Sequence, residues 1–370
     1  MKTCGALCAL LGLMGLAQVR SSCPDVDQYF GSMTSDTSEV NLGQTTELAC
    51  PNDEDTEIVI VSGQHLTVNS GIGYQEPVQF KNIRFTVEDG GSLTFEKFVH
   101  FGPNDQDVYT HAFYVNEGAA VTFMGNFRAS GVPSVVWNQG YTEFKAEAFF
   151  NQNSNVFTIN TGTLKFRGEA TFKNNEYHGI ENHSTGFVRF SKKAFFIGNG
   201  ATFDDTAGCG LENMGGTVIF RGDTTFSDHK CREAAAINNY GKMRFYGKAI
   251  FNDNINENLG YGQNQGGAIR IRDGSDLIFK GDVEFNRNSA HFGGGVGVVG
   301  GDMTFREAVS FTDNEGTMNG GAFAVLFEGS LTFSKPDLVT ASGNTASSEC
   351  SLGYVDEDGT VVGLDDFCDE

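Results

Sequence analysis

Short segments in which hydrophobic and polar residues alternate recur along most of the chain, and many of them end in phenylalanine. The first follows Gly91, where Ser-Leu-Thr-Phe95 places Leu and Phe on the same side of an extended segment. Its period of two, without a helical period, predicts a β-strand. Ten such segments cover 238 residues in nine steps, about 26 residues per step, and they end at Phe95, Phe123, Phe144, Phe166, Phe190, Phe220, Phe245, Phe279, Phe305 and Phe333.

Each repeat contains two further features. A second Phe usually follows the first after six residues, and an Asn follows that second Phe after three. These Phe-x-x-Asn pairs are Phe101/Asn104, Phe150/Asn153, Phe172/Asn175, Phe196/Asn199, Phe251/Asn254, Phe285/Asn288 and Phe311/Asn314, while one copy has His229 in place of Asn. A third apolar run then leads to the next Gly, at residues 112–116, 135–138, 157–160, 234–239, 267–271, 294–299 and 321–327.

Three short strands per repeat, separated by turns, describe one coil of a right-handed parallel β-helix, so we predict an all-β solenoid of about ten coils. One coil cannot bury its hydrophobic face alone, whereas stacked coils share a continuous core. Equivalent residues then lie above one another about 4.8 Å apart. The phenylalanines become columns of stacked rings. We expect the asparagines to form a ladder of side-chain amides at a turn, where Asn also tolerates a left-handed backbone.

Both ends of the chain differ from the repeats. Residues 1–17 carry one charge and an apolar run of about 12 residues, too short to span a bilayer, so we predict a secretory signal peptide there. Residues 23–57 hold nine acids and residues 349–370 hold eight, and neither segment contains a base. Charged segments block the open edges of a β-helix. We therefore assign residues 18–57 and 341–370 to acidic caps and residues 58–340 to the repeats.

The formal charge of −22, from 47 acids and 25 bases, restricts the partners. Nucleic acid and anionic membrane surfaces both require a basic protein surface, so we expect neither as the main partner. No stretch after residue 17 is apolar enough for a transmembrane helix. We expect a mature chain that is secreted and acts outside the cell or at a cell surface.

Six cysteines follow the signal peptide, and an even number in a secreted chain predicts disulfides. Their spacing forms three local pairs, although 15 connectivities are possible. None has the spacing of a zinc site, and the acidic run Asp356–Gly359 lacks the remaining ligands of a calcium loop, so we expect no metal and no cofactor. The six are Cys23, Cys50, Cys209, Cys231, Cys350 and Cys368.

Three late coils combine Phe-x-x-Asn with Gly-Gly-Ala-apolar or a close variant. These pairs are residues 251–254 with 266–269, 285–288 with 293–296, and 311–314 with 320–323. The combination resembles the repeat of the chlamydial polymorphic membrane proteins over roughly residues 245–330. The resemblance implies a secreted β-helix that acts in adhesion at cell surfaces, with no catalytic residues. We expect this chain to lack the membrane barrel of the autotransporter members, because only 37 residues follow Phe333.

Residues beside the first Phe of each repeat must point outward when that Phe points inward. In seven consecutive coils at least one of these positions is basic, which predicts a row about 29 Å long at the strand spacing. We interpret this row as a groove for an extended anionic glycan or another cell-surface polymer. The competing interpretation is an ordinary charged surface with Glu147, Glu169, Asp223 and Asp282 as ion-pair partners. The basic residues are Lys145, Lys165, Arg167, Arg189, Arg221, Arg244, Lys280 and Arg306.

Sequence fragments that would indicate catalysis are incomplete. Asn160–Gly162, His178-Gly179, Asp204-Asp205 and Arg270–Arg272 resemble pieces of polygalacturonase motifs, but their order is wrong and the first and last lie four coils apart. Gly295-x-Gly297-x-x-Gly300 matches a dinucleotide fingerprint, yet a strand follows it, so we interpret these residues as turn glycines. We predict a non-enzymatic protein that acts in binding or adhesion at a cell surface or in the extracellular matrix. The alternative is a polysaccharide lyase, hydrolase or epimerase of this fold that acts on acidic glycans.

Overall fold

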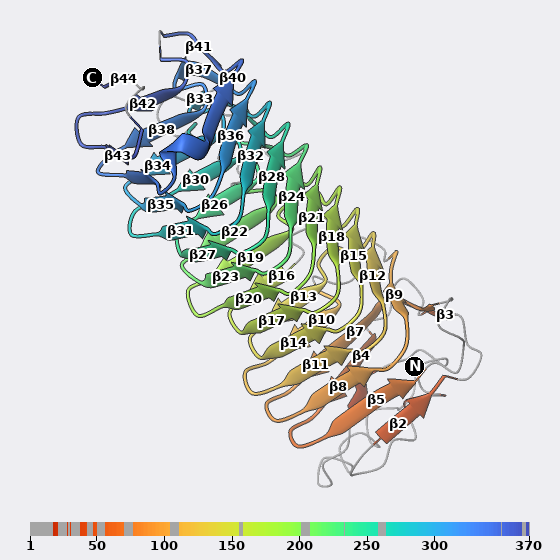
Figure 1. The fold of residues 1–370 in the computed structure, drawn as a ribbon. Helices are drawn as coiled ribbons and strands as arrows, with labels where there is room; N and C mark the ends of the chain where they lie inside the picture. The colour runs from red at the N-terminus through yellow and green to blue at the C-terminus, as the bar shows by residue number, and fades with distance from the viewer. Residues whose placement is uncertain are drawn as a thin grey trace.

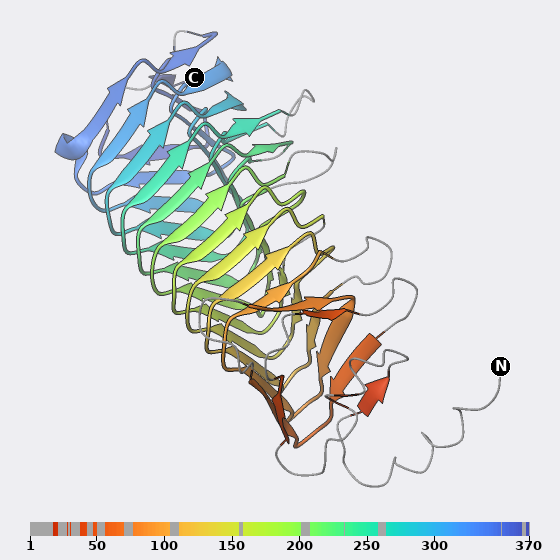
Figure 2. The same cartoon turned by 90° about the vertical axis from the view of Figure 1, so that its right-hand side faces the viewer.

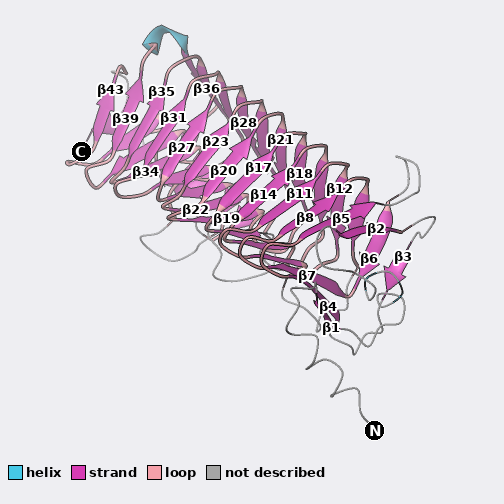
Figure 3. Cartoon of the chain, turned by 90° about the horizontal axis from the view of Figure 1, so that it is seen from below, coloured by secondary structure: helices cyan, strands magenta, loops and turns pink. Residues whose placement is uncertain are grey.

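A computed structural model describes residues 18–20, 28, 30, 38–42, 47–49, 56–69, 77–103, 111–154, 158–200, 208–232, 234–257, 264–348, 350–364 and 368–369. The chain winds into a long stack of coils, with the two ends of the chain at opposite ends of the stack (Figure 1). A view turned by 90° shows the coils following one another in chain order (Figure 2). Strands dominate, and the 3-10 helix η1 (Pro336–Leu338) lies near the C-terminal end (Figure 3). The predicted all-β parallel β-helix is confirmed.

The described strands form three long sheets and one short sheet, with 14, 13, 12 and five strands. Neighbouring strands are parallel, apart from the antiparallel pair of β1 with β4. The first sheet contains β1 (Gln18–Arg20), β4 (Thr56–Ile60), β7 (Ile83–Val87), β10 (Phe113–Val115), β13 (Val136–Asn138), β16 (Thr158–Asn160), β19 (Ile180–His183), β22 (Leu211–Met214), β26 (Ile237–Asn239), β30 (Ile269–Ile271), β34 (Val296–Val299), β38 (Phe323–Leu326), β42 (Gly353–Val355) and β44 (Cys368–Asp369).

The second sheet holds the strands that end in the ten predicted phenylalanines. It contains β2 (Ser38–Asn41), β5 (His65–Asn69), β8 (Ser92–Phe95), β11 (Ala120–Phe123), β14 (Tyr141–Phe144), β17 (Thr163–Phe166), β20 (Phe187–Phe190), β23 (Thr217–Phe220), β27 (Lys242–Phe245), β31 (Asp276–Phe279), β35 (Asp302–Phe305), β39 (Ser330–Phe333) and β43 (Thr360–Val362).

The third sheet follows the second within each coil. It contains β3 (Glu47–Ala49), β6 (Val78–Lys81), β9 (Val99–Phe101), β12 (Phe127–Ser130), β15 (Ala148–Asn151), β18 (Ala170–Lys173), β21 (Ala194–Ile197), β24 (Thr224–Ser227), β28 (Ala249–Asn252), β32 (Val283–Asn286), β36 (Val309–Thr312) and β40 (Val339–Ser342).

The short fourth sheet was not predicted from the sequence. It follows the Phe-x-x-Asn turn in the later coils, where the connection to the next first-sheet strand leaves room for extra pairing. Its strands are β25 (Lys230–Cys231), β29 (Ile255–Asn256), β33 (Ser289–Phe292), β37 (Glu315–Asn319) and β41 (Thr345–Ala346).

The long sheets continue into both segments that the sequence assigns to acidic caps. At the N-terminal end, β2 and β3 pair in parallel with β5 and β6. At the C-terminal end, β42 and β43 pair in parallel with β38 and β39. The predicted signal peptide lies outside the described residues, as do Cys23 and Cys50.

Two columns of phenylalanine rings fill the interior, as predicted. In the first column, the ten second-sheet residues from Phe95 to Phe333 are in register, are at most 3% exposed, and have ring centroids 4.5–5.3 Å apart. The second column comes from the third sheet and meets the first edge to face, with Phe166 and Phe172 5.7 Å apart at 83°. Ala129 interrupts the second column, and the ring of Phe127, two residues earlier, packs between its neighbours instead.

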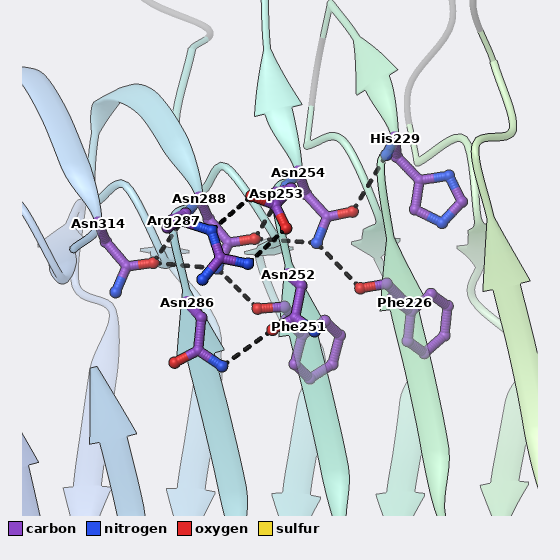
Figure 4. Close-up of polar contacts among 10 residues, drawn as sticks. All are labelled: Phe226, His229, Phe251, Asn252, Asp253, Asn254, Asn286, Arg287, Asn288 and Asn314. Atoms are coloured by element: carbon purple, nitrogen blue, oxygen red, sulfur yellow. Dashed lines mark hydrogen bonds and ion pairs between the residues drawn. The ribbon is translucent and has the colours of Figure 1, made fainter. Parts of the chain in front are cut away.

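The predicted asparagine ladder is also confirmed (Figure 4). Asn288 Oδ1 accepts hydrogen bonds from Asn254 Nδ2 at 2.9 Å and from the Asn254 backbone N–H at 3.1 Å. Asn314 Oδ1 accepts the same two bonds from Asn288, both at 3.0 Å. Asn104 lies outside the described residues. The ladder runs through Asn153, Asn175, Asn199, His229, Asn254, Asn288, Asn314 and Asn344.

The left-handed residue of this turn is the one directly before the ladder asparagine, rather than the asparagine itself. The φ angle is 56° at Asp253, 54° at Arg287 and 54° at Asp313. Because the turn is completed one residue earlier, both the backbone N–H and the amide of the following Asn are directed at the next coil. The residues at the left-handed position do not take part in the ladder. At this position in two adjacent coils, Arg287 Nη2 lies 2.7 Å from Asp253 Oδ2 and forms an ion pair.

A second buried ladder, which the sequence analysis missed, lies at the ends of the first-sheet strands. Asn138 Nδ2 donates to Asn160 Oδ1 at 2.7 Å, and the same bond links Asn182 to Asn213 at 2.9 Å and Asn213 to Asn239 at 2.7 Å. The signal was present, because a Gly follows each of these asparagines within four residues. The first ladder thus follows the third-sheet strands, and the second lies at the ends of the first-sheet strands.

The predicted turn glycines include one that is not in a turn. Gly297 lies in strand β34, and a Cβ built there would come within 2.8 Å of the Gly266 backbone nitrogen. Gly300 does occupy a left-handed turn, with φ 77°. Gly297 is therefore required by close packing of adjacent coils rather than by turn geometry.

Candidate functional site

The predicted basic residues lie on the outer face of the second sheet. Lys165 and Arg189 precede their column phenylalanines and are paired in register, and Arg244 occupies the same position two coils further on. The predicted row is thus two neighbouring columns, one on each side of the buried phenylalanines. The remaining bases directly follow their phenylalanines and are Lys145, Arg167, Arg221, Lys280 and Arg306.

Three of these bases converge on one exposed tyrosine. Tyr246 follows Phe245 and stands between Arg221 and Lys280 in the same column. The Arg221 Cζ atom is 4.6 Å from the ring centroid, and Lys280 Nζ is 4.4 Å from it. A hydrogen bond from Lys280, together with the charges of Lys280, Arg221 and Arg244, lowers the pKa of Tyr246. The ring therefore separates two like charges and attracts both through its negative face.

Two bases of this face, Arg167 and Arg244, have acidic partners, but not the ones predicted. Arg167 Nε is 2.7 Å from Glu143 Oε1, and Arg244 forms an ion pair with Asp276. Both acids belong to a neighbouring coil, because the nearest outward side chain is the one stacked above or below rather than the one two or three residues along the strand. Asp223, one of the predicted partners, accepts a hydrogen bond from the backbone N–H of Lys248 at 3.1 Å.

The coil of Phe190 carries two polar groups without a partner among the described atoms. These are the Nε–H of Arg189 and the hydroxyl of Ser191, which flank Phe190 on the basic face. A polar group that is shielded from water and unpaired is costly, so these two atoms lower the stability of this coil.

The outer face of the first sheet presents a different set of side chains. A single column runs in register from one coil to the next through Tyr114, Trp137, Ile159, Glu181, Glu212 and Asn238. The sequence analysis missed this column. From Trp137 onward, its signal is the residue directly before each asparagine of the second ladder, which must point outward because that Asn points inward, while Tyr114 precedes the buried Val115.

Aromatic side chains gather at one end of this column. The rings of Tyr114 and Trp137 are stacked, with centroids 6.2 Å apart and an angle of 21°. His111 meets Trp137 edge to face at 5.3 Å, and its Nδ1 is 3.1 Å from the Tyr114 hydroxyl. Burial, and to a lesser extent the charge of Arg84, lowers the pKa of His111 to about 4. His111 is therefore neutral at physiological pH and can hold the tyrosine hydroxyl by a hydrogen bond.

Two carboxylates occupy the next positions of the column. Glu181 and Glu212 are paired residues of adjacent parallel strands, which places their Cα atoms about 4.8 Å apart. His183 Nε2 lies 2.7 Å from Glu181 Oε1, and His178 Nε2 lies 3.4 Å from Glu212 Oε2. Asn238 Nδ2 also donates to Glu212 Oε1 at 3.2 Å. These contacts orient both carboxylates on the outer face.

The predicted polygalacturonase-like fragments do not come together around this pair. Asn160 belongs to the second ladder inside the stack, and four strand pairings separate its strand β16 from β30, which holds Arg270. Asp204 and Asp205 lie outside the described residues. Of these fragments, His178 does contact a carboxylate of the column, that of Glu212.

One predicted cysteine pair is confirmed as a disulfide. Cys209 and Cys231 are bonded, with Cα atoms 6.2 Å apart, and they connect neighbouring coils. Cys350 is disulfide-bonded as well. Within the described ranges, no group of three His, Cys, Asp or Glu side chains is arranged to hold a metal ion. No helix in that part of the chain is long and apolar enough to cross a membrane.

The parallel sheets and repeated coils make this protein a parallel β-helix, and its candidate binding surfaces are the outer faces of the first and second sheets. Comparison with known proteins adds no closer assignment, since no protein-family model, curated protein or solved structure matches the chain. The function must therefore be argued from the faces themselves.

Proposed function

We propose that this is a secreted, non-enzymatic β-helix protein that binds an anionic glycan at a cell surface or in the extracellular matrix. The observation that carries the proposal is the basic face of the second sheet, with Arg221, Tyr246 and Lys280 at its centre. Seven consecutive coils contribute at least one base to this face, while the whole chain carries a formal charge of −22. The concentration of bases on one face is the feature that an anionic partner would recognise.

The shape of the face suits an extended polymer. Each coil adds about 4.8 Å along the stack, so the bases present regularly spaced cations over the length of several sugar units. Carboxylate or sulfate groups of the glycan would accept charge-assisted hydrogen bonds from the arginines and lysines.

Two further features support an extracellular role. The Cys209–Cys231 disulfide is typical of an oxidising compartment, in agreement with the predicted signal peptide. The Phe-x-x-Asn and Gly-Gly motifs resemble the repeat of the chlamydial polymorphic membrane proteins, a resemblance that implies adhesion at cell surfaces.

The test is retention on a sulfated-glycan column. Changing Arg221→Gln and Lys280→Gln together is expected to abolish retention without lowering the Tm, because both side chains lie on the outer face. Retention of the unchanged protein is expected to weaken steeply with salt, since exposed charges are screened. The matched control, Lys173→Gln with Lys335→Gln, removes the same charge from other surfaces and should preserve retention. Equal retention of both double variants would eliminate the basic face as the binding site.

A further inference from the structure

We propose that the outer face of the first sheet is a second glycan site that takes an uncharged polysaccharide. The site is the strip formed by Tyr114, Trp137, Ile159, Glu181 and Glu212, hereafter the first-sheet strip. It lies on a different sheet from the basic face, so the inference does not depend on the function proposed above.

The aromatic end of the strip offers a surface for sugar rings. The interior of this protein is built from phenylalanine, whereas its only tryptophan is on the outer face, partly exposed and stacked on Tyr114. The large flat rings of Trp and Tyr combine apolar contact area with a polar edge, which explains their abundance at binding surfaces. The C–H faces of pyranose rings can pack against such rings. His111 and the stacking contact fix the orientation of both aromatics.

The carboxylate end supplies hydrogen-bond acceptors for hydroxyl groups. Each ionised carboxylate has about four lone-pair positions, so the contact of Glu181 with His183 leaves acceptor capacity on Glu181. The contacts with His183, His178 and Asn238 hold both carboxylates in place, which reduces the entropy lost on binding. Two adjacent negative charges repel a uronate or sulfated chain. The strip therefore selects an uncharged, hydroxyl-rich polymer.

The register of the strands makes the strip continuous. Trp137 and Glu181 are two strand steps apart, about 10 Å, with Ile159 between them in the same column. A polymer lying along the stack can thus contact the aromatic rings and the carboxylates at the same time.

Trp137 is the only tryptophan, so its fluorescence reports on the strip directly. The probes are hydroxyethylcellulose, soluble β-glucan and mannan, with polygalacturonate as the charged comparison. We expect a saturable change in emission with at least one uncharged probe and none with polygalacturonate. Tyr114→Ala should weaken this binding about tenfold, corresponding to about 1.4 kcal/mol, and Glu181→Gln should weaken it as well.

The basic-face variant Arg221→Gln with Lys280→Gln serves as the matched control, and its fluorescence titration should equal that of the unchanged protein. Conversely, Tyr114→Ala should bind the sulfated-glycan column normally, so failure of one site is distinguishable from failure of the other. Circular dichroism melts confirm that each variant is folded. An unchanged emission with all uncharged probes, or a response to polygalacturonate alone, would overturn the inference. Release of reducing ends that Glu212→Gln abolishes would also overturn it, by assigning hydrolysis to the paired carboxylates.

Discussion

Replacing His229 with asparagine tests how the buried ladder responds to pH. His229 is fully buried and takes the place of an asparagine in the ladder, with its Nδ1 accepting the backbone N–H of Asn199 at 3.1 Å. Its Nε2 has no partner among the described atoms. Burial lowers the pKa of His229 from 6.5 to about 4. Asparagine at this position can accept the same N–H through Oδ1, as Asn199 does from Asn175 at 3.0 Å.

The direction of the effect follows from the lowered pKa. Above pH 6.5 the imidazole is neutral in both the folded and the unfolded chain, so it contributes no pH dependence. As the pH falls from 6.5 to 4, the unfolded chain binds a proton that the folded chain excludes, and folding stability decreases. The difference of about 2.5 between the two pKa values corresponds to about 3 kcal/mol. His100 and His111, whose pKa values are also lowered to about 4, act in the same direction.

The measurement is the free energy of unfolding in urea between pH 4.5 and 7.5. At pH 7.5 we expect His229→Asn to lie within about 1 kcal/mol of the unchanged protein, since one ladder acceptor replaces another. At pH 4.5 the variant should have gained about 2–3 kcal/mol relative to the unchanged protein, because it no longer excludes that proton. Thr171→Asn, a change at a non-titratable residue on the outward side of β18, is the control and should leave the pH profile unchanged. Parallel profiles for His229→Asn and the unchanged protein would refute the assignment of His229 as a neutral ladder acceptor.

Two further predictions concern the stack itself. Phe285→Ala removes a ring stacked between its neighbours at 5.0 and 5.1 Å and should cost about 3–5 kcal/mol in urea unfolding, whereas Lys173→Ala on the exposed surface should cost under about 0.5 kcal/mol. Equal costs would mean that the strand faces the opposite way. Asn288→Ala should cost about 2–4 kcal/mol, because it leaves the backbone N–H of Asn254 and one of the two Asn254 Nδ2–H groups unpaired, while the other still donates to the Phe226 carbonyl. Asn286→Ala, on the outward side of strand β32 just before this turn, should cost under about 1 kcal/mol. A similar loss of unfolding free energy for both variants would show that the ladder does not contribute specifically to stability.

The interior of this protein could be predicted from the sequence because its contacts are between equivalent residues. When every coil carries the same spacing, Phe95 must meet Phe123 and Asn254 must meet Asn288, whatever the length of the connections. One position does not follow this rule. Ala129 occupies a phenylalanine position, and the ring of Phe127 compensates from two residues earlier, which only the packing of neighbouring rings reveals.

The outer faces were only partly predictable. The outward direction of the basic residues followed from alternation along each strand, and that direction places them on one face. The partners of these basic residues could not be predicted from alternation, because Arg244 contacts Asp276 and Arg221 contacts Tyr246 across coils of unequal length. The neighbours within the first-sheet strip could not be predicted either, because Glu181 and Glu212 are 31 residues apart in the chain yet adjacent in the sheet.

The sequence alone therefore determined the fold class, the columns that fill the core and the sign of the charge on the second-sheet face. Only the tertiary structure decided which outward side chains become neighbours. The physical reason is that most positions of a core column must repeat one residue type to pack against the adjacent coils, whereas an outer column accepts any residue that solvent or a cross-coil partner can satisfy. The residue type in an outer column varies from coil to coil, so the contacts between its side chains can be identified only when the register of the strands is known.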